Sequence, residues 1–375
     1  MSTVLICCDK FKGSATSAEV SEALATGLTR AGHDVAVSPL ADGGDGTLEA
    51  FDSLGYRRIP THARGSDGRV IATEYGMKDS TAVIEIARVC GLDQASPDGQ
   101  TPASDAARQA SSCGVGDLII DAVDQGASRI IIGLGGSATT DAGFGLAQAL
   151  GVEFFDAKSS PVSHVRDMGS VARASLVRID PRLASVEFVI ASDVRNPLTG
   201  STGAAAVYGP QKGLNSADVQ EIHQAIGHFA QVVEETTGLP GIAQRPGAGA
   251  AGGLGFMAAA LLSATMCSGV DLILDETGGE KLLEQADLVI TGEGRIDAQT
   301  LSGKAPAGIA ERARSRGIPV VAVCGQNQLE GASASSLFEA IYSLAEYESD
   351  VHECIRNPLP ILENIGRDIA EHHFA

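Results

Sequence analysis

Six short segments of this sequence concentrate the side chains that could do chemistry, namely carboxylates, hydroxyls and cations set among glycines. They cover residues 9–14, 41–47, 133–143, 192–198, 247–255 and 291–304. Most of them follow a short apolar run and precede a helical pattern. In open α/β sheets, ligands bind beyond the carboxyl ends of the strands, where such loops meet. The pattern therefore predicts an anion-binding enzyme site assembled from loops.

The first two segments offer acids and ammonium groups to a substrate. In residues 9–14, Asp9, Lys12 and Ser14 precede a helical pattern, which suits a hydroxy-acid or a phosphate. A plain polar turn is the alternative. In residues 41–47, Asp42 and Asp45 are set among glycines, so both carboxylates can converge on Mg²⁺ or on a substrate hydroxyl. Asp-Gly pairs are also ordinary turn formers.

The third segment, residues 133–143, is suited to binding phosphate through the backbone. The N–H groups of Gly135, Gly136 and Ser137 are expected to face an anion, helped by the dipole of a helix predicted over residues 139–150. The hydroxyl of Thr139 can add a phosphate contact. This segment therefore predicts a phosphate site between a strand and a helix.

Further along the chain, residues 247–255 offer a ligand only their backbone. Gly252 and Gly253 there predict either a second phosphate cradle or close packing of the following helix.

Asp141, near the end of the third segment, can add a phosphate or metal contact.

The fourth and sixth segments place acids beside cations. Asp193 follows a predicted strand and is close in sequence to Arg195, which favours it as a general base or a metal ligand. An Asx turn into Pro197 is the alternative. The sixth segment mixes both charges, as a metal–phosphate site requires. Its charged side chains are Glu293, Arg295, Asp297 and Lys304.

The strands and helices that must position these loops are predicted to form an α/β fold. Buried strands are predicted at residues 4–8, 34–40, 129–132, 188–191, 288–291 and 320–324. Helices are predicted at 16–30, 47–54, 139–150, 216–237 and 305–316, with a closing helix over 350–373. Residues 56–87 alternate polar and apolar around turns at 67–68 and 79–80, which indicates antiparallel strands of a second, inserted domain.

Composition narrows the function classes. The chain has 375 residues, 44% of them hydrophobic, which suggests two domains. Its formal net charge of −20 argues against nucleic acid or an anionic membrane as the main partner. The longest apolar stretch is too short to span a bilayer, and no signal peptide is evident, so a cytoplasmic location is expected. The seven cysteines show no CxxC spacing, and an oligomer is compatible with the sequence.

Two other function classes remain open on spacing alone. Gly133-x-Gly135-x-x-Ala138, with Glu153 further on, matches the fingerprint of a Rossmann-type NAD(P)-dependent dehydrogenase, although such matches are weak in a glycine-rich chain. A non-enzymatic small-molecule sensor is the second class, but it would need neither clustered acids nor clustered hydroxyls. A Walker A loop and the protein-kinase signatures are absent from the sequence.

Taken together, the segments resemble the type I glycerate kinases. The resemblance spans nearly the whole chain and preserves the order of that family's motifs. They read DKFKGS, ADGGDGT, GLGGSATTDAGFGLAQALG, SDVRNPLTG, GAAAVYGPQKG, GAGAAGGLG and DLVITGEGRIDAQTLSGK. Cys8 and Lys10 replace a proline and a serine that are usual in the first motif, and Asp45 stands where glutamate is usual.

The resemblance implies two α/β domains with the active site in a cleft between them. The expected bounds are 1–55 with 285–375 for a discontinuous, Rossmann-like domain, and 56–284 for the inserted one. The implied reaction moves the γ-phosphate of ATP to D-glycerate, most often at the 2-hydroxyl, and needs Mg²⁺. Transfer to the 3-hydroxyl is the alternative.

This reaction assigns roles to the candidate residues. Those expected to act in catalysis are Asp193, Asp42, Lys12 and Arg195. Those expected to bind the substrate are Asp9, Lys12, Ser14, Asp45 and Arg295. Those expected to bind ATP are Gly135, Gly136, Ser137, Thr139, Gly252, Gly253, Glu293 and Lys304. The expected Mg²⁺ ligands are Asp193 and Asp297.

Overall fold

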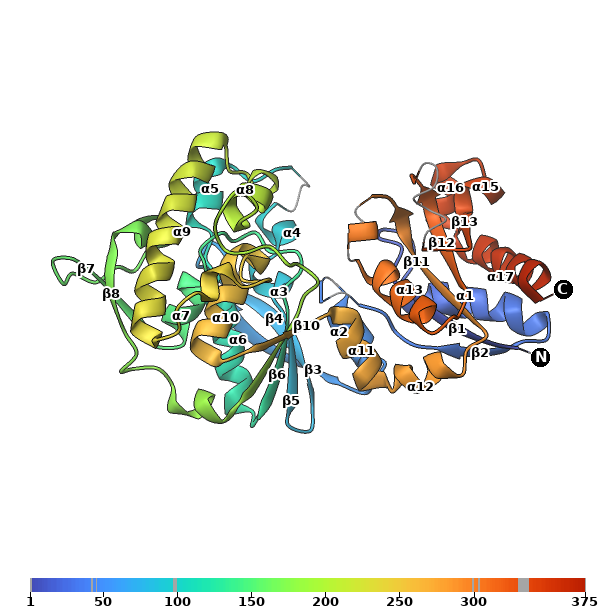
Figure 1. Cartoon of the computed structure of the whole chain (residues 1–375), viewed down its shortest axis with the longest axis horizontal. Helices are drawn as coiled ribbons and strands as arrows, with labels where there is room; N and C mark the ends of the chain where they lie inside the picture. Colours follow the sequence, from blue (N-terminus) through green and yellow to red (C-terminus); the bar gives the residue numbers. More distant parts are fainter. Residues whose placement is uncertain are drawn as a thin grey trace. The chain divides into compact units, whose positions relative to one another are not determined.

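The computed structural model describes residues 2–41, 43–44, 46–96, 100–298, 300–302, 304–329 and 337–374. Contacts divide the chain into two compact units (Figure 1). The first unit combines Met1–Asp42 with Gly269–Ala375, and the second unit is the continuous segment Gly43–Ser268. The second unit is therefore inserted into the sequence of the first.

The first unit is built on a parallel sheet of five strands. Their spatial order is β13 (Ala340–Ser343), β12 (Val320–Asn327), β11 (Leu288–Ile296), β1 (Thr3–Cys8) and β2 (Asp34–Val37). Because successive side chains of a strand point to opposite faces, β1 contributes to two cores. Val4 and Ile6 belong to the cluster that includes helix α1 (Ser17–Arg30), and Leu5 and Cys7 to the opposite cluster.

Helices cover both faces of this sheet. Helices α1 and α17 (Leu359–Phe374) lie on one side, and α11 (Gly269–Thr277), α12 (Gly279–Glu284) and α13 (Ala305–Ser315) lie on the other. Two short helices, α15 (Leu344–Tyr347) and α16 (Val351–Arg356), precede α17. Helix α1 begins at the predicted capping box, in which Thr16 and Glu19 satisfy each other's backbone N–H groups.

The second unit contains a mixed sheet of six strands. Their order is β10 (Thr265–Cys267), β9 (Glu187–Ala191), β6 (Arg129–Gly133), β5 (Thr81–Glu85), β4 (Val70–Lys78) and β3 (Arg57–Arg64). The first four are parallel, and β4 pairs antiparallel with both β5 and β3. The antiparallel strands predicted for residues 56–87 are thus confirmed, with turns at the predicted positions.

Short and long helices surround this sheet. They are α2 (Thr47–Asp52), α3 (Ala87–Cys90), α4 (Leu92–Ala95), α5 (Ser104–Gln109), α6 (Cys113–Asp124), α7 (Phe144–Ala149), α8 (Ala204–Tyr208), α9 (Ser216–Thr237) and α10 (Leu254–Leu262). A separate antiparallel pair joins β7 (Glu153–Asp156) and β8 (Val171–Ser175). Strands β6 and β7 therefore lie in different sheets, so β6, α7 and β7 do not form the βαβ unit that the dehydrogenase fingerprint requires.

Several predicted element bounds differ from the structure, and three of these differences concern the start, the continuity or the end of an element. The helix predicted over 139–150 begins only at Phe144, because residues 134–143 form an irregular loop. The closing helix is split into α16 and α17 around Pro358, whose ring cannot continue a helix. The strand predicted over 34–40 ends at Val37. The α/β class with two units, one discontinuous and one carrying antiparallel strands, is confirmed.

The two units divide earlier in the chain than the boundaries placed at 55/56 and 284/285. Helix α2 packs against β4 and β5, so residues 43–55 lie with the second unit. Helices α11 and α12 pack with each other, and α11 packs against α13, so residues 269–284 lie with the first. The amino-acid composition does not indicate that residues 43–55 join the second unit or that residues 269–284 join the first.

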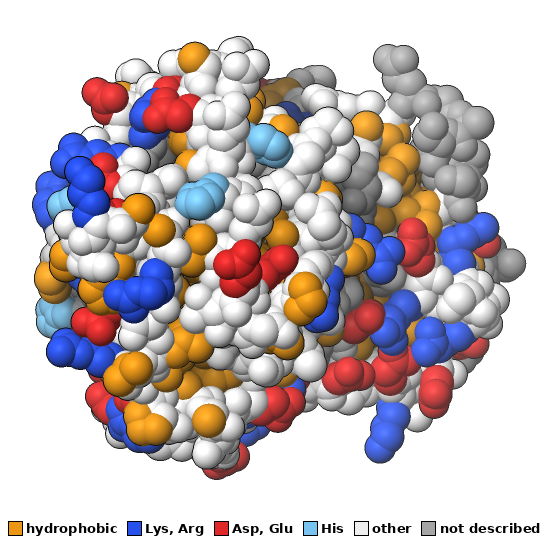
Figure 2. Space-filling view, turned by 60° about the vertical axis from the view of Figure 1, so that its left-hand side comes forward, with side chains coloured by type: hydrophobic (Ala, Val, Ile, Leu, Met, Phe, Trp, Pro, Cys, Tyr) orange, Lys and Arg blue, Asp and Glu red, His pale blue; other side chains and the backbone are white. Residues whose placement is uncertain are grey.

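The surface of the molecule carries both charges. On the face in Figure 2, Lys and Arg side chains lie among Asp and Glu side chains and scattered apolar ones. None of the helices described here combines the length and apolar character needed to cross a bilayer. The cytoplasmic location stays a prediction.

Candidate active site

In the second unit, two loops meet above the carboxyl ends of β6 and β9. We call residues 134–143 the β6 loop and residues 43–46, of which 43, 44 and 46 are described, the α2 loop. The Gly135 N–H donates to the Gly43 carbonyl at 3.0 Å. A Cβ on Gly135 would lie 2.1 Å from the Gly44 Cα, and one on Gly43 would lie 2.2 Å from the Ala191 carbonyl oxygen. Only glycine permits this close approach.

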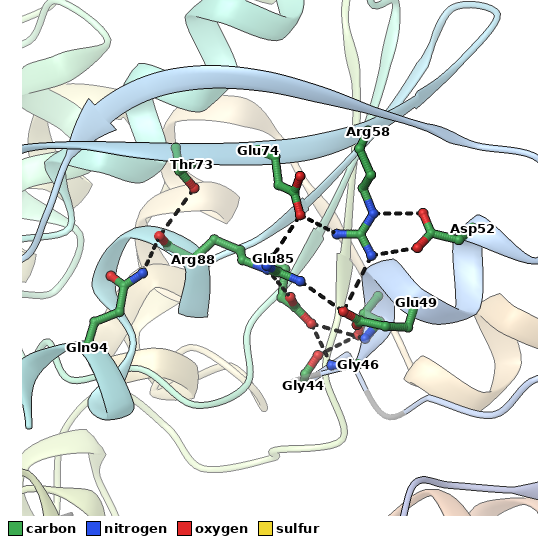
Figure 3. Close-up of polar contacts among 11 residues, drawn as sticks. Gly44, Gly46, Glu49, Asp52, Arg58, Thr73, Glu74, Glu85, Arg88 and Gln94 are labelled. Carbon is green, nitrogen blue, oxygen red and sulfur yellow. Dashed lines mark hydrogen bonds and ion pairs between the residues drawn. The ribbon is translucent and has the colours of Figure 1, made fainter. Parts of the chain in front are cut away.

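A buried carboxylate fixes the α2 loop. Glu85, the last residue of β5, is 1% exposed, and its Oε1 accepts the N–H groups of Gly46 at 2.7 Å and Thr47 at 3.1 Å (Figure 3). Its Oε2 accepts the Nε of Arg88 at 3.0 Å. Burial raises the pKa of the Glu85 carboxyl and Glu49 adds to this, while hydrogen bonds from Arg88 and Gly46 oppose it. The sheet thereby holds the start of α2.

Two arginines extend this contact into a network. Arg88 also donates to Glu49 at 2.9 Å and to Glu74 at 3.4 Å. Arg58 binds Asp52 through two parallel hydrogen bonds, each 2.7 Å long, and donates to Glu74 at 3.2 Å. Bidentate pairs of this kind are the most directional ionic contacts available to arginine. The network links β3, β4, β5, α2 and α3, as Figure 3 shows.

The β6 loop offers backbone donors to a ligand. Among the described residues, no acceptor pairs with the N–H of Gly136 or of Ser137, whereas the Gly135 N–H is already used by Gly43. Neighbouring groups of this loop are fixed, since the Ala138 N–H donates to the Cys90 carbonyl and the Gly136 carbonyl accepts from Leu92. The predicted phosphate cradle thus retains Gly136 and Ser137, and the Gly135 N–H is not available for it.

Asp141 has a structural role in the β6 loop. It is fully buried, and its carboxylate accepts the N–H groups of Gly143 and Gly145 and both the N–H and the hydroxyl of Ser112, at 2.8 to 3.1 Å. These bonds use backbone N–H groups at the start of α7, those of Gly143 and Gly145. The expectation that the dipole of this helix assists an anion at Gly135–Ser137 is therefore wrong, and so is the expected ligand contact of Asp141.

A lysine that the sequence analysis did not single out lies against the β6 loop. Lys212 is 3% exposed, and its Nζ donates to the Ser137 Oγ at 2.9 Å and to the Thr139 carbonyl at 2.6 Å. Burial lowers its pKa to about 8, while Cys90 and Asp141 act in the opposite direction. Its sequence signal was a lysine between two glycines in GPQKG. Glu85 also had a signal, as the acid that ends an apolar strand.

Gly252 and Gly253 pack closely on the same loop. A Cβ on Gly252 would lie 1.9 Å from the Thr139 carbonyl oxygen, and one on Gly253 would lie 2.5 Å from the Ala142 Cα. The Gly252 carbonyl accepts the Ala142 N–H at 2.9 Å. Of the two interpretations left open for this segment, close packing has direct support, and ATP contacts by these glycines stay a prediction.

The loop after β9 presents the acid and the cation predicted for it. Asp193 is half-buried and Arg195 is exposed. Asn196 anchors the loop, since its amide donates to the Thr202 carbonyl and its Oδ1 accepts the Tyr208 hydroxyl, both at 2.8 Å. The anchored loop places Asp193 directly beyond a buried strand, close to the carboxyl ends of the parallel strands of the second unit.

In the first unit, the loop after β1 lies beside strand β11. The Asp9 N–H donates to the Gly292 carbonyl at 2.8 Å. Lys12 is exposed, whereas the Ser14 hydroxyl donates to the Ile355 carbonyl at 2.7 Å. That bond ties the β1 loop to α16, so Ser14 retains only acceptor capacity for a substrate.

The segment after Gly292 carries a compact charged group. Glu293 is buried, accepts the Thr300 hydroxyl at 2.5 Å and binds the Lys304 ammonium at 3.0 Å. Arg295 is mostly exposed, and its Nε lies 3.4 Å from the Asp297 carboxylate. Four of the predicted residues are therefore brought together here, whereas Asp42 and Asp45 lie outside the described residues.

The predicted residues fall into two groups, one in each unit. Asp193 belongs to the second unit and Asp297 to the first. In the described part of the chain, no three His, Cys, Asp or Glu side chains form a ready metal cluster. Mg²⁺ in phosphotransferases commonly takes one or two carboxylates and completes its shell with phosphate and water, so single carboxylates fit that role.

Comparison with known proteins decides the family. The family model described as "Glycerate kinase family" matches residues 4–373. The chain belongs to the glycerate kinase family. A protein named glycerate kinase from Halalkalibacterium halodurans is 39% identical over 99% of this chain and 98% of its own length. One named glycerate 2-kinase from Escherichia coli K12 is 33% identical over 98% of this chain and 97% of its own.

Solved structures agree with this membership of the glycerate kinase family. A crystal structure assigned to glycerate kinase 2 of Salmonella typhimurium LT2 superposes with a TM-score of 0.82 at 33% identity. The match covers 99% of this chain and 97% of that one. The match therefore extends over the sequence of both units, and the protein is a kinase.

Proposed function

We propose that this protein transfers the γ-phosphoryl group of ATP to D-glycerate at its 2-hydroxyl, giving 2-phospho-D-glycerate and ADP. The observation that carries the proposal is the near full-length similarity to proteins named glycerate kinase. The relative named glycerate 2-kinase supports the choice of hydroxyl. The chain offers the parts that phosphoryl transfer requires, namely phosphate donors, cations and carboxylates.

In this proposal the β6 loop binds a phosphate of ATP. The N–H groups of Gly136 and Ser137 supply neutral donors, and Thr139 and Lys304 add contacts to the nucleotide. Because the loop is anchored through Cys90 and Gly43, its donors are set before the ligand arrives. Such preorganised donors avoid reorganisation during the reaction.

Carboxylates and cations divide the remaining roles. Asp193, with Asp42 as the second candidate, accepts the proton of the attacking hydroxyl, which contributes roughly 10²–10⁴-fold to the rate. Asp193 and Asp297 are the candidates to hold Mg²⁺, which would neutralise phosphate charge when bound. Lys12, Arg195 and Arg295 are suited to bind the glycerate carboxylate, because they are exposed cations in loops that follow strands.

A coupled ADP-release assay tests the proposal. Mg²⁺-ATP is supplied with D-glycerate, L-glycerate, glycolate or tartronate, and oxidation by NAD⁺ or NADP⁺ is followed in parallel. The expected result is ADP release that depends on D-glycerate and Mg²⁺. Reduced nicotinamide without ADP release would instead favour a dehydrogenase, and turnover of another hydroxy-acid alone would overturn the substrate assignment.

A further inference from the structure

Lys212 is a buried cation whose protein partners are neutral. Among the described residues, its ammonium group bonds to a hydroxyl and a backbone carbonyl, those of Ser137 and Thr139. Within the described part of the chain, no carboxylate forms an ion pair with it. Burying an ammonium without a counter-charge is costly, so such groups are usually paired or bind an anion.

The acidic groups nearest to Lys212 do not neutralise it. Asp141 lies beyond ion-pair distance, and both of its oxygens accept hydrogen bonds from Ser112, Gly143 and Gly145. The second neighbour, the Cys90 thiol, has a pKa raised to about 12 by burial, so it is uncharged at neutral pH. A negative charge for Lys212 must therefore come from outside the described residues.

The donors around Lys212 form a set suited to an oxyanion. An ammonium group has three N–H donors, and two of them are used by residues that the structure describes. The Ser137 hydroxyl accepts one of these, so its own proton stays available to another acceptor. The Lys212 Nζ and the Ser137 Oγ lie 2.9 Å apart, and the Gly136 and Ser137 N–H groups belong to the same turn of the loop.

We propose that Lys212 is the charged residue of an oxyanion-binding subsite on the β6 loop, completed by the Ser137 hydroxyl and the N–H groups of Gly136 and Ser137. The oxyanion is a phosphate of the nucleotide or the carboxylate of the hydroxy-acid. The assignment of these two ligands rests on the proposed function, whereas the subsite itself rests on Lys212 and its contacts.

Lys212 takes over the role that the sequence pattern had given to a helix dipole. Asp141 occupies the start of α7, so the positive potential at the β6 loop comes from the lysine. The charge is also titratable. Burial lowers the pKa of Lys212 to about 8, opposed by Cys90 and Asp141, so the positive charge is lost as pH rises through that value. Ligand affinity is expected to fall with it.

Direct binding tests the subsite without relying on turnover. Dissociation constants for inorganic phosphate, ADP and D-glycerate are measured by titration calorimetry at pH 7 for the full-length wild type, Lys212→Met and Lys158→Met. Methionine keeps the length of the side chain and removes its charge. Lys158 is an exposed lysine of the same unit and provides the matched control.

Lys212→Met is expected to weaken binding of the relevant ligand about 10- to 100-fold, while Lys158→Met binds like the wild type. A loss confined to ADP and phosphate assigns the subsite to the nucleotide, and a loss confined to D-glycerate assigns it to the substrate carboxylate. Unchanged affinity for all three ligands in a folded Lys212→Met protein would overturn the proposal. None of these outcomes depends on catalytic activity, so failure of the proposed function is detected separately.

A pH series covers the case in which Lys212→Met does not fold. In the wild type, the dissociation constant for the same ligand is expected to rise between about pH 7.5 and 9.5, approaching tenfold per pH unit above the lysine pKa. Lys212→Arg, which keeps its charge over this range, should flatten that rise. A wild-type dissociation constant that stays constant over this range would also overturn the proposal.

Discussion

The Oε1 of Glu85 lies 2.7 Å from the backbone nitrogen of Gly46, although the two residues are 39 positions apart in the sequence. This hydrogen bond joins the end of β5 to the α2 loop, which crosses the carboxyl ends of β6 and β9. The same carboxylate is bound by Arg88, which also contacts α2 and β4. A single buried acid thus positions a glycine loop over the edge of the sheet.

Removing the Glu85 carboxylate should destabilise the second unit. Glu85→Ala leaves the buried Thr47 N–H and the part-buried Gly46 N–H without their acceptor, and an unsatisfied buried donor costs about 1–3 kcal/mol. Glu85→Gln keeps an oxygen for both donors and loses only the contact with Arg88, so its loss should be smaller. Urea unfolding measures the loss in free energy of unfolding for both variants, with Glu235→Ala, at an exposed position, as control. Equal losses would show that the backbone contacts contribute little.

The packing of Gly252 on the β6 loop can be separated from its backbone conformation. Gly252 and Gly238 have nearly the same φ, +71° and +70°, but only at Gly252 would a Cβ collide with another backbone atom. Gly238→Ala should cost about 1 kcal/mol from conformation alone. Gly252→Ala should cost at least ~2 kcal/mol more and raise KM for ATP, because the β6 loop must shift. Similar Tm and KM values for the two variants would contradict this account.

The buried hydrogen bonds of Asp141 predict a strong structural effect. Asp141→Ala leaves donors of Ser112, Gly143 and Gly145 without an acceptor. The expected loss in free energy of unfolding is about 3 kcal/mol or more, from several unsatisfied buried donors. Thermal unfolding measures it, and Asp105→Ala, at an exposed position, should stay close to the wild type. A Tm near that of the wild type would mean that water replaces the carboxylate.

Much of the fold was predictable from local patterns, because strands and helices are encoded by short-range periodicity. The capping box at Thr16 and Glu19 and the helix from Ser216 to Thr237 were predicted at their observed bounds. Helix α7 was predicted over residues 139–150, which extends it too far toward its N-terminus, because it begins only at Phe144. Its true start depends on Ser112, a residue distant in sequence, which binds Asp141.

The candidate site was predictable only in part, for a related reason. Glycine and hydroxyl clusters identified the loops, since those residue types stand out in sequence. Lys212 and Glu85 were not found because their significance lies in burial and in distant partners, such as Ser137 and Gly46. Which N–H groups stay available also depended on tertiary contacts, as the pairing of Gly135 with Gly43 shows.

The assignment of Asp193 as the base predicts a defined kinetic pattern. Asp193→Asn removes a proton acceptor and keeps the shape of the side chain, so kcat should fall by roughly 10²–10⁴-fold with little change in KM for ATP. Steady-state kinetics against ATP and D-glycerate measures both parameters, with Asp105→Asn as control. A kcat near the wild-type value would transfer the role of base to Asp42.

The most direct test of the account is to identify the product. Wild-type protein is incubated with Mg²⁺-ATP and D-glycerate, and the mixture is followed by ³¹P NMR with authentic 2- and 3-phosphoglycerate as references. The account predicts one 2-phosphoglycerate for each ADP formed. ADP accompanied only by inorganic phosphate would contradict transfer to glycerate, and 3-phosphoglycerate as the product would contradict the assigned hydroxyl.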